Sequence, residues 1–583
     1  MRVGNHEVYW HRPLAAYLCP HTEKPVMLSK APLGYLTAYP ADAPDPAQPI
    51  VLWPRLLHRE YHVDAVSLFE HFHDPRPHQT SRNVRRLVDA REFFSSQPIP
   101  RSFARQMMNL GRQQTLDDWL AALPERASPV ERGRWLAEEL RSWLEEPISE
   151  QEHKKKLGRS LTYERTAKRS FEVAYWKTIA GLAEGKYVNK DNADCVRDTT
   201  TGALLKHHHR DLEGLGDHLL AYYRRVVASA GMSGKALVGE LPFRWRTDFD
   251  FGWAGGWLHN QEGKTYERDL VVVIPGRDRR RAVIMADHYD TAYMEDHYEG
   301  RLRGKGGRLA AAGADDNHSA TVALMLGAKP FLALSKAGRL DCDIWLVHLT
   351  GEEFPSDCMG ARALCEHLVQ GTLKLRLADG SDHDLSNVRI QGVYVLDMIA
   401  HNNDRAPDIF QISPGTGRES LWLAYQAHLA AELWNASVPN WNERRGRRGL
   451  GRGRRSKSGK KIPAPAQHPQ LSGEVRLPYD PRSVVYNTDG QIFSDAGVPV
   501  VLFMENYDIN RKGYHDSHDT MENIDLDYGA AVAAITIESV ARAATQKPES
   551  VPLTPIPSPR RVEGRMTNSF PPKGRRSRKA RGL

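Results

Sequence analysis

From about residue 212 to residue 545, short runs of consecutive apolar residues alternate with longer stretches of helical periodicity. Runs of this short length predict strands that are buried on both faces, whereas the longer periodic stretches predict helices. The expected strands are 282–286, 342–349, 392–396 and 498–504, and the expected helices are 212–230, 319–337, 359–369, 421–434 and 528–545. This alternation predicts an α/β fold with a mostly parallel central sheet flanked by helices.

The residues before this region follow a different pattern. Proline-rich turns near 39–49 give way to stretches such as 117–123 and 132–144, where Trp and Leu recur at helical spacing. We therefore expect an N-terminal, mainly helical extension over residues 1–206, with no motif that suggests chemistry. A second domain is expected over residues 207–548.

The net charge of +8 is unevenly distributed along the chain. Residues 442–461 carry a balance of +9 and residues 551–583 carry +8, so the remaining residues together carry −9. Both basic segments are rich in Arg, Lys, Gly, Ser or Pro, a composition that cannot bury a core. We interpret 442–461 as a solvated, low-complexity insert and 549–583 as a disordered tail. This interpretation is favoured over an accessory contact with nucleic acid or another polyanion.

Apolar runs and cysteines limit the classes of protein that the chain can represent. No apolar stretch approaches the roughly 20 residues that a membrane helix needs, and the N-terminus lacks the apolar centre of a secretory signal. The sequence therefore predicts a cytoplasmic protein without a membrane partner. The five cysteines form no CxxC pair, so any metal is expected to be held by histidines and carboxylates.

Histidines and carboxylates follow the predicted strands at five successive connections. The carboxyl ends of parallel strands meet at one edge of a sheet, where ligands gather. One such residue is commonly a cap or a satisfied hydrogen-bonding group, but five in order predict a site. The connections carry His288 and Asp290, then Asp316, then Glu352 and Glu353, then Asp397, and finally His515.

Nitrogen and oxygen ligands without thiolates suit hydrolytic zinc sites, which keep a position for water. Two histidines and three carboxylates suffice for two ions. The adjacent Glu352 and Glu353 would point in different directions, so one could bind metal while the other accepts a proton from water. Asp290 lies two residues after His288 and is placed to accept the second ring N–H of that histidine.

These motifs resemble those of the co-catalytic di-zinc aminopeptidases, whose relatives include glutamate-carboxypeptidase-like peptidases and glutaminyl cyclases. The similarity extends over roughly residues 212–544 and rests on the order and spacing of five motifs. They are HYDT at 288–291, GADDN at 313–317, GEE at 351–353, LDM at 396–398 and YHxxxDT at 514–520.

The resemblance implies a role for each residue of the site. Asp316 would bridge two zinc ions, with Glu353 and His515 on one ion. His288 and Asp397 would hold the other ion, and Glu352 would be the general base, with Asp290 supporting His288.

Within the last motif and the segment before it, the resemblance distinguishes further residues. His515 is preferred to His518 because the family places its histidine four residues before the Asp-Thr step. Tyr486 resembles a tyrosine that helps to polarise the scissile carbonyl in some members, although a core or surface tyrosine fits equally well. Asp489 resembles the acidic residue of the family's SDH step, but Gly490 follows it where the family has histidine.

The sequence thus predicts a zinc aminopeptidase with two Zn²⁺ per chain and a peptide substrate. One alternative is a glutaminyl-cyclase-like acyltransferase or a carboxypeptidase on the same scaffold. A cyclase of this type uses one zinc, and a carboxypeptidase needs arginines for the substrate carboxylate. A second alternative is a non-catalytic polyanion-binding protein with a vestigial metal site, against which the presence of Glu352 argues.

Overall fold

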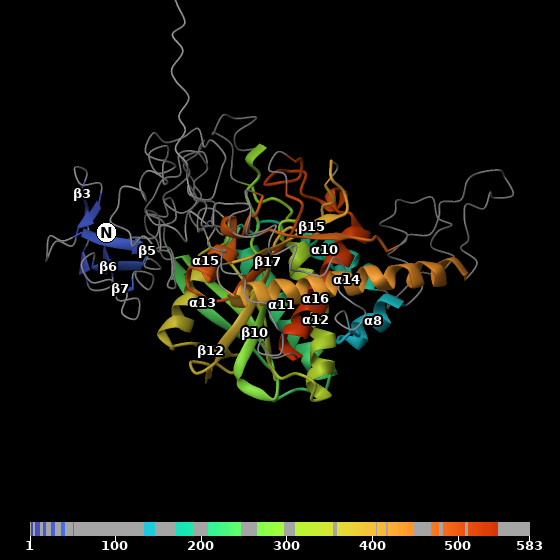
Figure 1. Ribbon diagram of the computed structural model, residues 1–583, viewed down its shortest axis with the longest axis horizontal. Coiled ribbons are helices and arrows are strands. Elements are labelled where there is room, and N and C mark those ends of the chain that lie inside the picture. The colour runs from blue at the N-terminus through green and yellow to red at the C-terminus, as the bar shows by residue number, and fades with distance from the viewer. Residues whose placement is uncertain are drawn as a thin grey trace, which may run out of the picture.

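The computed structural model describes most of the chain between residues 133 and 545 and a set of short N-terminal strands (Figure 1). The described ranges are 133–145, 171–191, 208–245, 265–296, 309–353, 358–403, 405–415, 418–447, 468–476, 482–507 and 511–545, with strands between residues 2 and 51. The predicted tail 549–583 lies outside them. In the described part of the chain, no helix is long and apolar enough to cross a membrane.

A ten-stranded sheet forms the centre of the fold, in the order β13-β12-β8-β9-β11-β10-β14-β17-β15-β16. Its strands are β8 (Leu237–Trp245), β9 (Thr265–Ile274), β10 (Asp278–His288), β11 (Cys342–Leu349), β12 (Lys374–Leu377), β13 (Asp382–Asp384), β14 (Arg389–Leu396), β15 (Ile409–Pro414), β16 (Ser472–Val475) and β17 (Val500–Glu505). The expected α/β fold is confirmed.

The prediction of a mostly parallel sheet needs correction, because the sheet is mixed. The strands β11, β10, β14 and β17 pair in parallel, as do β15 and β16. The remaining pairs are antiparallel, including β8 with β9, β9 with β11 and β12 with β13. Strands that follow one another directly along the chain, such as β8 and β9, can pair antiparallel without a crossover helix.

The four parallel central strands end at one edge of the sheet. His288, the last residue of β10, is level with Leu349 of β11, and Leu396 of β14 is level with Phe503 of β17. The segments that follow these strands therefore start from neighbouring positions. This register brings the predicted site residues together.

Helices cover both faces of the sheet. They are α11 (His208–Ser229), α12 (His318–Lys336), α13 (Met359–Gln370), α14 (Arg418–Arg447), α15 (Asp489–Asp495) and α16 (Leu526–Thr545), with short 3-10 helices η5 (Val485–Asn487) and η6 (Met521–Asn523). Alternate residues of β10 face opposite layers: Val283 and Met285 pack with α12 and α16, while Ile284 and Ala286 pack with α13 and α15. The burial of each valine, isoleucine or methionine side chain of this strand contributes about 1.5–3 kcal/mol.

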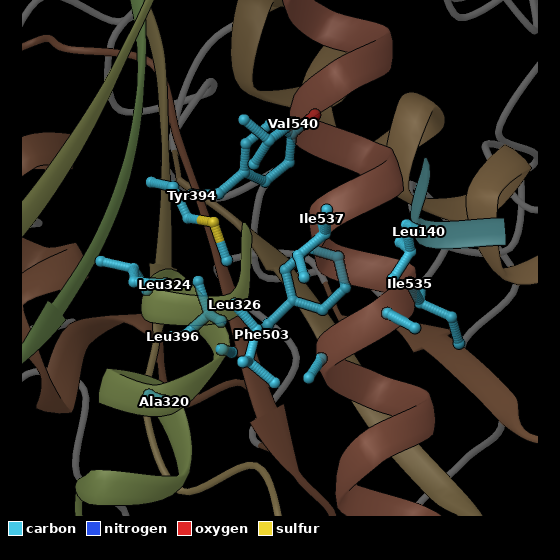
Figure 2. Packing of buried hydrophobic residues seen from close by; sticks show 14 of the residues in the cluster. Leu140, Ala320, Leu324, Leu326, Tyr394, Leu396, Phe503, Ile535, Ile537 and Val540 are labelled. Carbon is cyan, nitrogen blue, oxygen red and sulfur yellow. The ribbon is translucent and has the colours of Figure 1, made fainter. Parts of the chain in front are cut away.

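The larger core lies around α16. Figure 2 shows Ile537 and Val540 of α16 directed toward Phe503 and Tyr394 of the sheet. Leu140 belongs to the same core cluster. This residue lies in α8 (Glu138–Glu145), which precedes the second domain expected over residues 207–548. This helix and α10 (Phe171–Ala183) share the core cluster of the central sheet.

A buried carboxylate of α16 binds the two residues that directly precede α8. Glu538 accepts hydrogen bonds from the backbone N–H groups of Leu136 and Ala137 at 2.9–3.2 Å. The same carboxylate pairs with Arg542 at 3.1 Å, and both side chains are buried. Arg542 also donates to the carbonyl oxygen of Arg134. Residues 134–145 are therefore attached to the core.

The N-terminal region also contains strands, which the helical expectation did not include. They are β1 (Arg2–Val3), β2 (His6–Glu7), β3 (Tyr9–His11), β4 (Ala16–Leu18), β5 (Pro25–Ser29), β6 (Thr37–Pro40) and β7 (Ile50–Val51). The strands from β3 to β7 form an antiparallel sheet in sequence order. A mainly helical extension with a boundary at residue 206 stays a prediction. Between residues 52 and 206, the structure describes only residues 133–145 and 171–191, which contain α8 and α10.

The helix α14 continues into the predicted basic insert and is held by the chain that returns from it. It ends at Arg447, so residues 442–447 of the expected insert are helical, and 448–467 lie outside the described residues. The side chain of Asn442 bonds both the N–H and the carbonyl of His468. Two turns earlier, Asn435 does the same with Leu471.

Candidate metal centre

The loops after the parallel strands bring all five predicted ligands into one cluster. His288 ends β10, Asp397 follows β14 directly, and Asp316 lies two residues before α12. Glu353 follows β11, and His515 lies in the segment between β17 and η6. The four residues other than His515 are buried, and the His515 side chain is 14% exposed.

Two groups of three potential ligands share one carboxylate. In the first group, Nε2 of His288 lies 3.4 Å from Oδ1 of Asp316 and 3.4 Å from Oδ1 of Asp397. In the second group, Nε2 of His515 lies 3.3 Å from Oδ2 of Asp316 and 3.4 Å from Oε2 of Glu353. The two oxygens of Asp316 therefore face different histidines, as the bridging role requires.

The start of α12 is joined to the end of β14 on both sides of Asp397. The side-chain amide of Asn317 donates to the carbonyl of Leu396, and its oxygen accepts from the N–H of Met398. Because Asn317 directly follows Asp316, these bonds set the positions of two carboxylates with one side chain.

The charges of the cluster explain its altered pKa values. Burial opposes the charged form of His288, but the surrounding carboxylates outweigh this effect and raise its pKa well above the ordinary value. The same balance raises the pKa of His515. Burial alone would raise the pKa of Asp316, yet the two histidines on either side of it hold that pKa below its usual range.

Glu352 lies beside both groups without belonging to either. Its Oε2 is 3.9 Å from Nε2 of His288, and its Oε1 is 3.9 Å from Sγ of Cys358. Burial and the nearby carboxylates, Glu353 first among them, raise the pKa of Glu352 well above its ordinary value although His288 opposes this. A carboxyl group with a raised pKa suits a group that must both accept and donate a proton.

Asp290 holds the backbone of the two adjacent glutamates. Its carboxylate accepts hydrogen bonds from the N–H of Glu353 at 3.1 Å and of Glu352 at 3.4 Å. Nδ1 of His288 is 3.2 Å from the carbonyl oxygen of Asp290 and 3.6 Å from its carboxylate. The predicted support of His288 thus comes chiefly from the main chain of Asp290, whereas its side chain orients the GEE motif.

The donor set fits zinc. Each group offers three nitrogen and oxygen ligands, the number that catalytic zinc sites take from protein while one position stays open for water. Nε2 of His288 and Oδ1 of Asp397 are buried and have no hydrogen-bond partner among the described residues. Five carboxylates surround two histidines in this cluster, and such buried negative charge needs a cation. The carboxylates are Asp290, Asp316, Glu352, Glu353 and Asp397.

Several supporting residues were assigned no role from the sequence. Asp519 accepts the backbone N–H groups of Asp315 and Asp316, and burial raises its pKa to about 8. Arg511 spans the buried carboxylates of Asp315 and Glu505, each at 2.7 Å. Lys190, from the N-terminal region, donates to the carbonyl of Ala312 beside the GADDN motif.

The remaining predicted residues lie around the cluster. His518 is exposed and belongs to neither ligand group among the described residues, which agrees with the preference for His515. Asp489 is buried at the start of α15, and burial raises its pKa to about 8. Tyr486 lies in η5, but its side chain is outside the described part of the structure.

Paired carboxylate–histidine groups of this kind are typical of metal-dependent hydrolases. Residues 269–452 and 451–540 match the model of peptidase family M28. This match confirms the resemblance found in the motifs: residues 269–540 are similar to peptidase family M28.

Several solved structures are similar to this chain at low identity. LapA aminopeptidase of Legionella pneumophila is 14% identical, with a TM-score of 0.39 over 64% of this chain and 71% of that chain. A Zn-dependent exopeptidase from Parabacteroides distasonis is 15% identical, with a TM-score of 0.38 over 64% and 98% of the chains. A glutaminyl cyclase from Bacteroides thetaiotaomicron is 13% identical, with a TM-score of 0.37 over 64% and 98%. No curated protein matches the chain.

Proposed function

We propose that this protein is a zinc-dependent aminopeptidase that hydrolyses the N-terminal residue of peptides. The observation that carries the proposal is the pair of three-ligand groups that share Asp316, with Glu352 beside them but outside both. When bound, zinc polarises the scissile carbonyl and lowers the pKa of a water molecule to about 7. Asp316 would bridge the two ions.

The residues of the chain would carry out the proton transfers. Glu352 would accept a proton from the attacking water and deliver it to the leaving amine. Asp290 would hold Glu352 and Glu353 in register through their backbone N–H groups. This support keeps the base and the neighbouring ligand at fixed positions relative to each other.

The charge of the site favours a substrate with a free amine over one with a free carboxylate. The carboxylates of the cluster would attract the α-amine of a peptide. Arg511, whose charge interacts with Asp316, already contacts Asp315 and Glu505, and its side chain is 6% exposed. A carboxypeptidase would need a cation directed at the substrate, and this arginine is committed to two carboxylates of the chain.

We expect two zinc ions per purified chain and hydrolysis of aminoacyl-nitroanilides. A strong chelator should abolish turnover, and added Zn²⁺ or Co²⁺ should restore it, because three protein ligands per ion leave an exchangeable position. The measurements are metal content by atomic absorption and rates across a panel of amino acids. Peptides with a blocked N-terminus are the matched control and should not be cleaved.

Other results would assign the domain to the alternatives. About one zinc per chain with cyclisation of N-terminal glutamine would indicate a cyclase-like acyltransferase. Cleavage from the carboxyl terminus would indicate a carboxypeptidase. Two zinc ions without turnover, together with salt-sensitive polyanion binding, would indicate a binding protein.

A further inference from the structure

His515 is held in an uncommon backbone conformation. Its φ is +49°, in the left-handed region that residues other than glycine seldom adopt. Its ring stacks on the ring of Tyr514 at a centroid distance of 4.0 Å. Such a conformation persists when the surrounding structure holds it in place, so the contacts of His515 identify what positions this predicted ligand.

Glu295 contacts His515 at two points. The backbone N–H of Glu295 donates to the carbonyl of His515 at 2.8 Å. The Oε1 atom of Glu295 lies 3.2 Å from Nδ1 of the same histidine. A carboxylate can only accept a hydrogen bond, so Nδ1 carries a proton, and Nε2 is the atom that can give its lone pair to an ion. Nε2 is the atom that faces Asp316 and Glu353.

The segment that carries Glu295 is itself anchored near the site. It follows the HYDT motif, and the N–H of Met294 donates to the carbonyl of Leu309. The next residue, Asp296, accepts hydrogen bonds from both the N–H and the hydroxyl of Ser517. Glu295 and Asp296 therefore bind the segment of His515 to the loop that follows β10. Of these two residues, only Glu295 contacts the imidazole.

We propose that Glu295 is a positioning residue that fixes the tautomer and orientation of His515 and so sets the zinc affinity of the Asp316–Glu353–His515 group. The inference rests on the proposed zinc function. Groups that bond the second nitrogen of a metal-ligating histidine typically change metal affinity about 10–100-fold when they are replaced.

The two ligand groups differ in how their histidines are supported. Nδ1 of His288 lies against the carbonyl of Asp290, whose side chain is fully buried. The Glu295 side chain is 48% exposed. Solvent can therefore compete for the support of His515 but not for that of His288. It follows that the His515 group exchanges its ion more readily.

Zinc titrations of matched variants test this proposal. Glu295→Ala should weaken the binding of one zinc ion about 10–100-fold, and the second ion should be unaffected. Glu295→Gln should lose less zinc affinity than Glu295→Ala, because its amide oxygen can still accept a hydrogen bond from Nδ1 of His515. Asp296→Ala should also lose less zinc affinity than Glu295→Ala. It removes the hydrogen bonds to Ser517 but keeps the contact of Glu295 with the imidazole. Asp382→Ala, an exposed carboxylate on β13, is the distant control and should match the parent protein.

The proposal is overturned if Glu295→Ala binds zinc as the Asp382→Ala variant does. It is also overturned if Asp296→Ala loses as much affinity as Glu295→Ala, because the segment would then act only by holding the loop. A second measurement needs no metal: ¹H–¹⁵N NMR of histidine-labelled, metal-free protein should show a hydrogen-bonded Nδ1–H signal of His515, and Glu295→Ala should lose that signal. If the parent protein binds no zinc, the proposed function fails, and the Nδ1–H signal still decides the role of Glu295.

Discussion

Replacing Glu352 by Gln is expected to lower kcat about 10²–10⁴-fold while both zinc ions remain bound. The amide is nearly isosteric with the carboxylate but cannot accept the proton of the attacking water. Glu352 belongs to neither ligand group, so the change should leave the metal content as it is. Turnover of an aminoacyl-nitroanilide and zinc content, measured on the same preparation, check both parts.

Glu353→Gln is the matched control, because the two glutamates are adjacent and share the support of Asp290. Glu353 lies 3.4 Å from His515 within a ligand group, so its amide variant should lose zinc from that group. Loss of metal from Glu352→Gln with retention in Glu353→Gln would reverse the two roles. Full activity in both variants would place the chemistry elsewhere.

Removing the Glu538 carboxylate is expected to destabilise the protein by about 3–5 kcal/mol, because it leaves the Arg542 guanidinium buried without its counter-charge. Glu538→Ala also removes the acceptor for the backbone N–H groups of Leu136 and Ala137. The start of α8 should then separate from α16. Urea denaturation gives the change in midpoint, and hydrogen exchange of residues 134–145 reports the local opening.

Two further variants test whether the loss of stability comes from the burial of this ion pair rather than from charge pairing alone. Glu139 of α8 pairs with Lys329 of α12 at 2.7 Å, but the two side chains are 33% and 56% exposed. Glu139→Ala should therefore cost no more than about 1 kcal/mol. Adding Arg542→Met to Glu538→Ala should recover part of the lost stability. An equal cost for Glu139→Ala and Glu538→Ala would contradict the explanation.

The central strands and the candidate ligands were predictable because both depend on local sequence. Apolar runs such as 342–349 form strands wherever both faces are covered, and the residues that follow them must lie at one sheet edge. His288, Asp397 and the adjacent pair Glu352 and Glu353 are found through this rule alone, whereas the choice of Glu353 as the ligand came from the family resemblance. The choice of His515 over His518 needed the spacing of a known family, because both histidines lie in the same irregular segment.

The mixed topology and the supporting residues were not predictable, since they depend on contacts between distant segments. The apolar residues of β9 are compatible with either strand direction, and the strand lies between β8 and β11, antiparallel to both. Lys190 and Ala312 are separated by more than a hundred residues. No local pattern marks Arg511 or Glu295 as partners of the site, because each lies outside the regular strands and helices and contacts residues that are distant in the sequence.

The two asparagines of α14 have a consequence for how this protein can vary in length. Asn442 and Asn435 hold the returning chain at His468 and Leu471, so the connection 448–467 leaves and rejoins the fold along a single helix. Its length can then change without moving β15, β16 or the candidate metal centre. The closure entropy of a connection grows slowly with its length, by about 0.6 kcal/mol for each doubling. This position is therefore suited to carrying an inserted peptide tag or an additional domain.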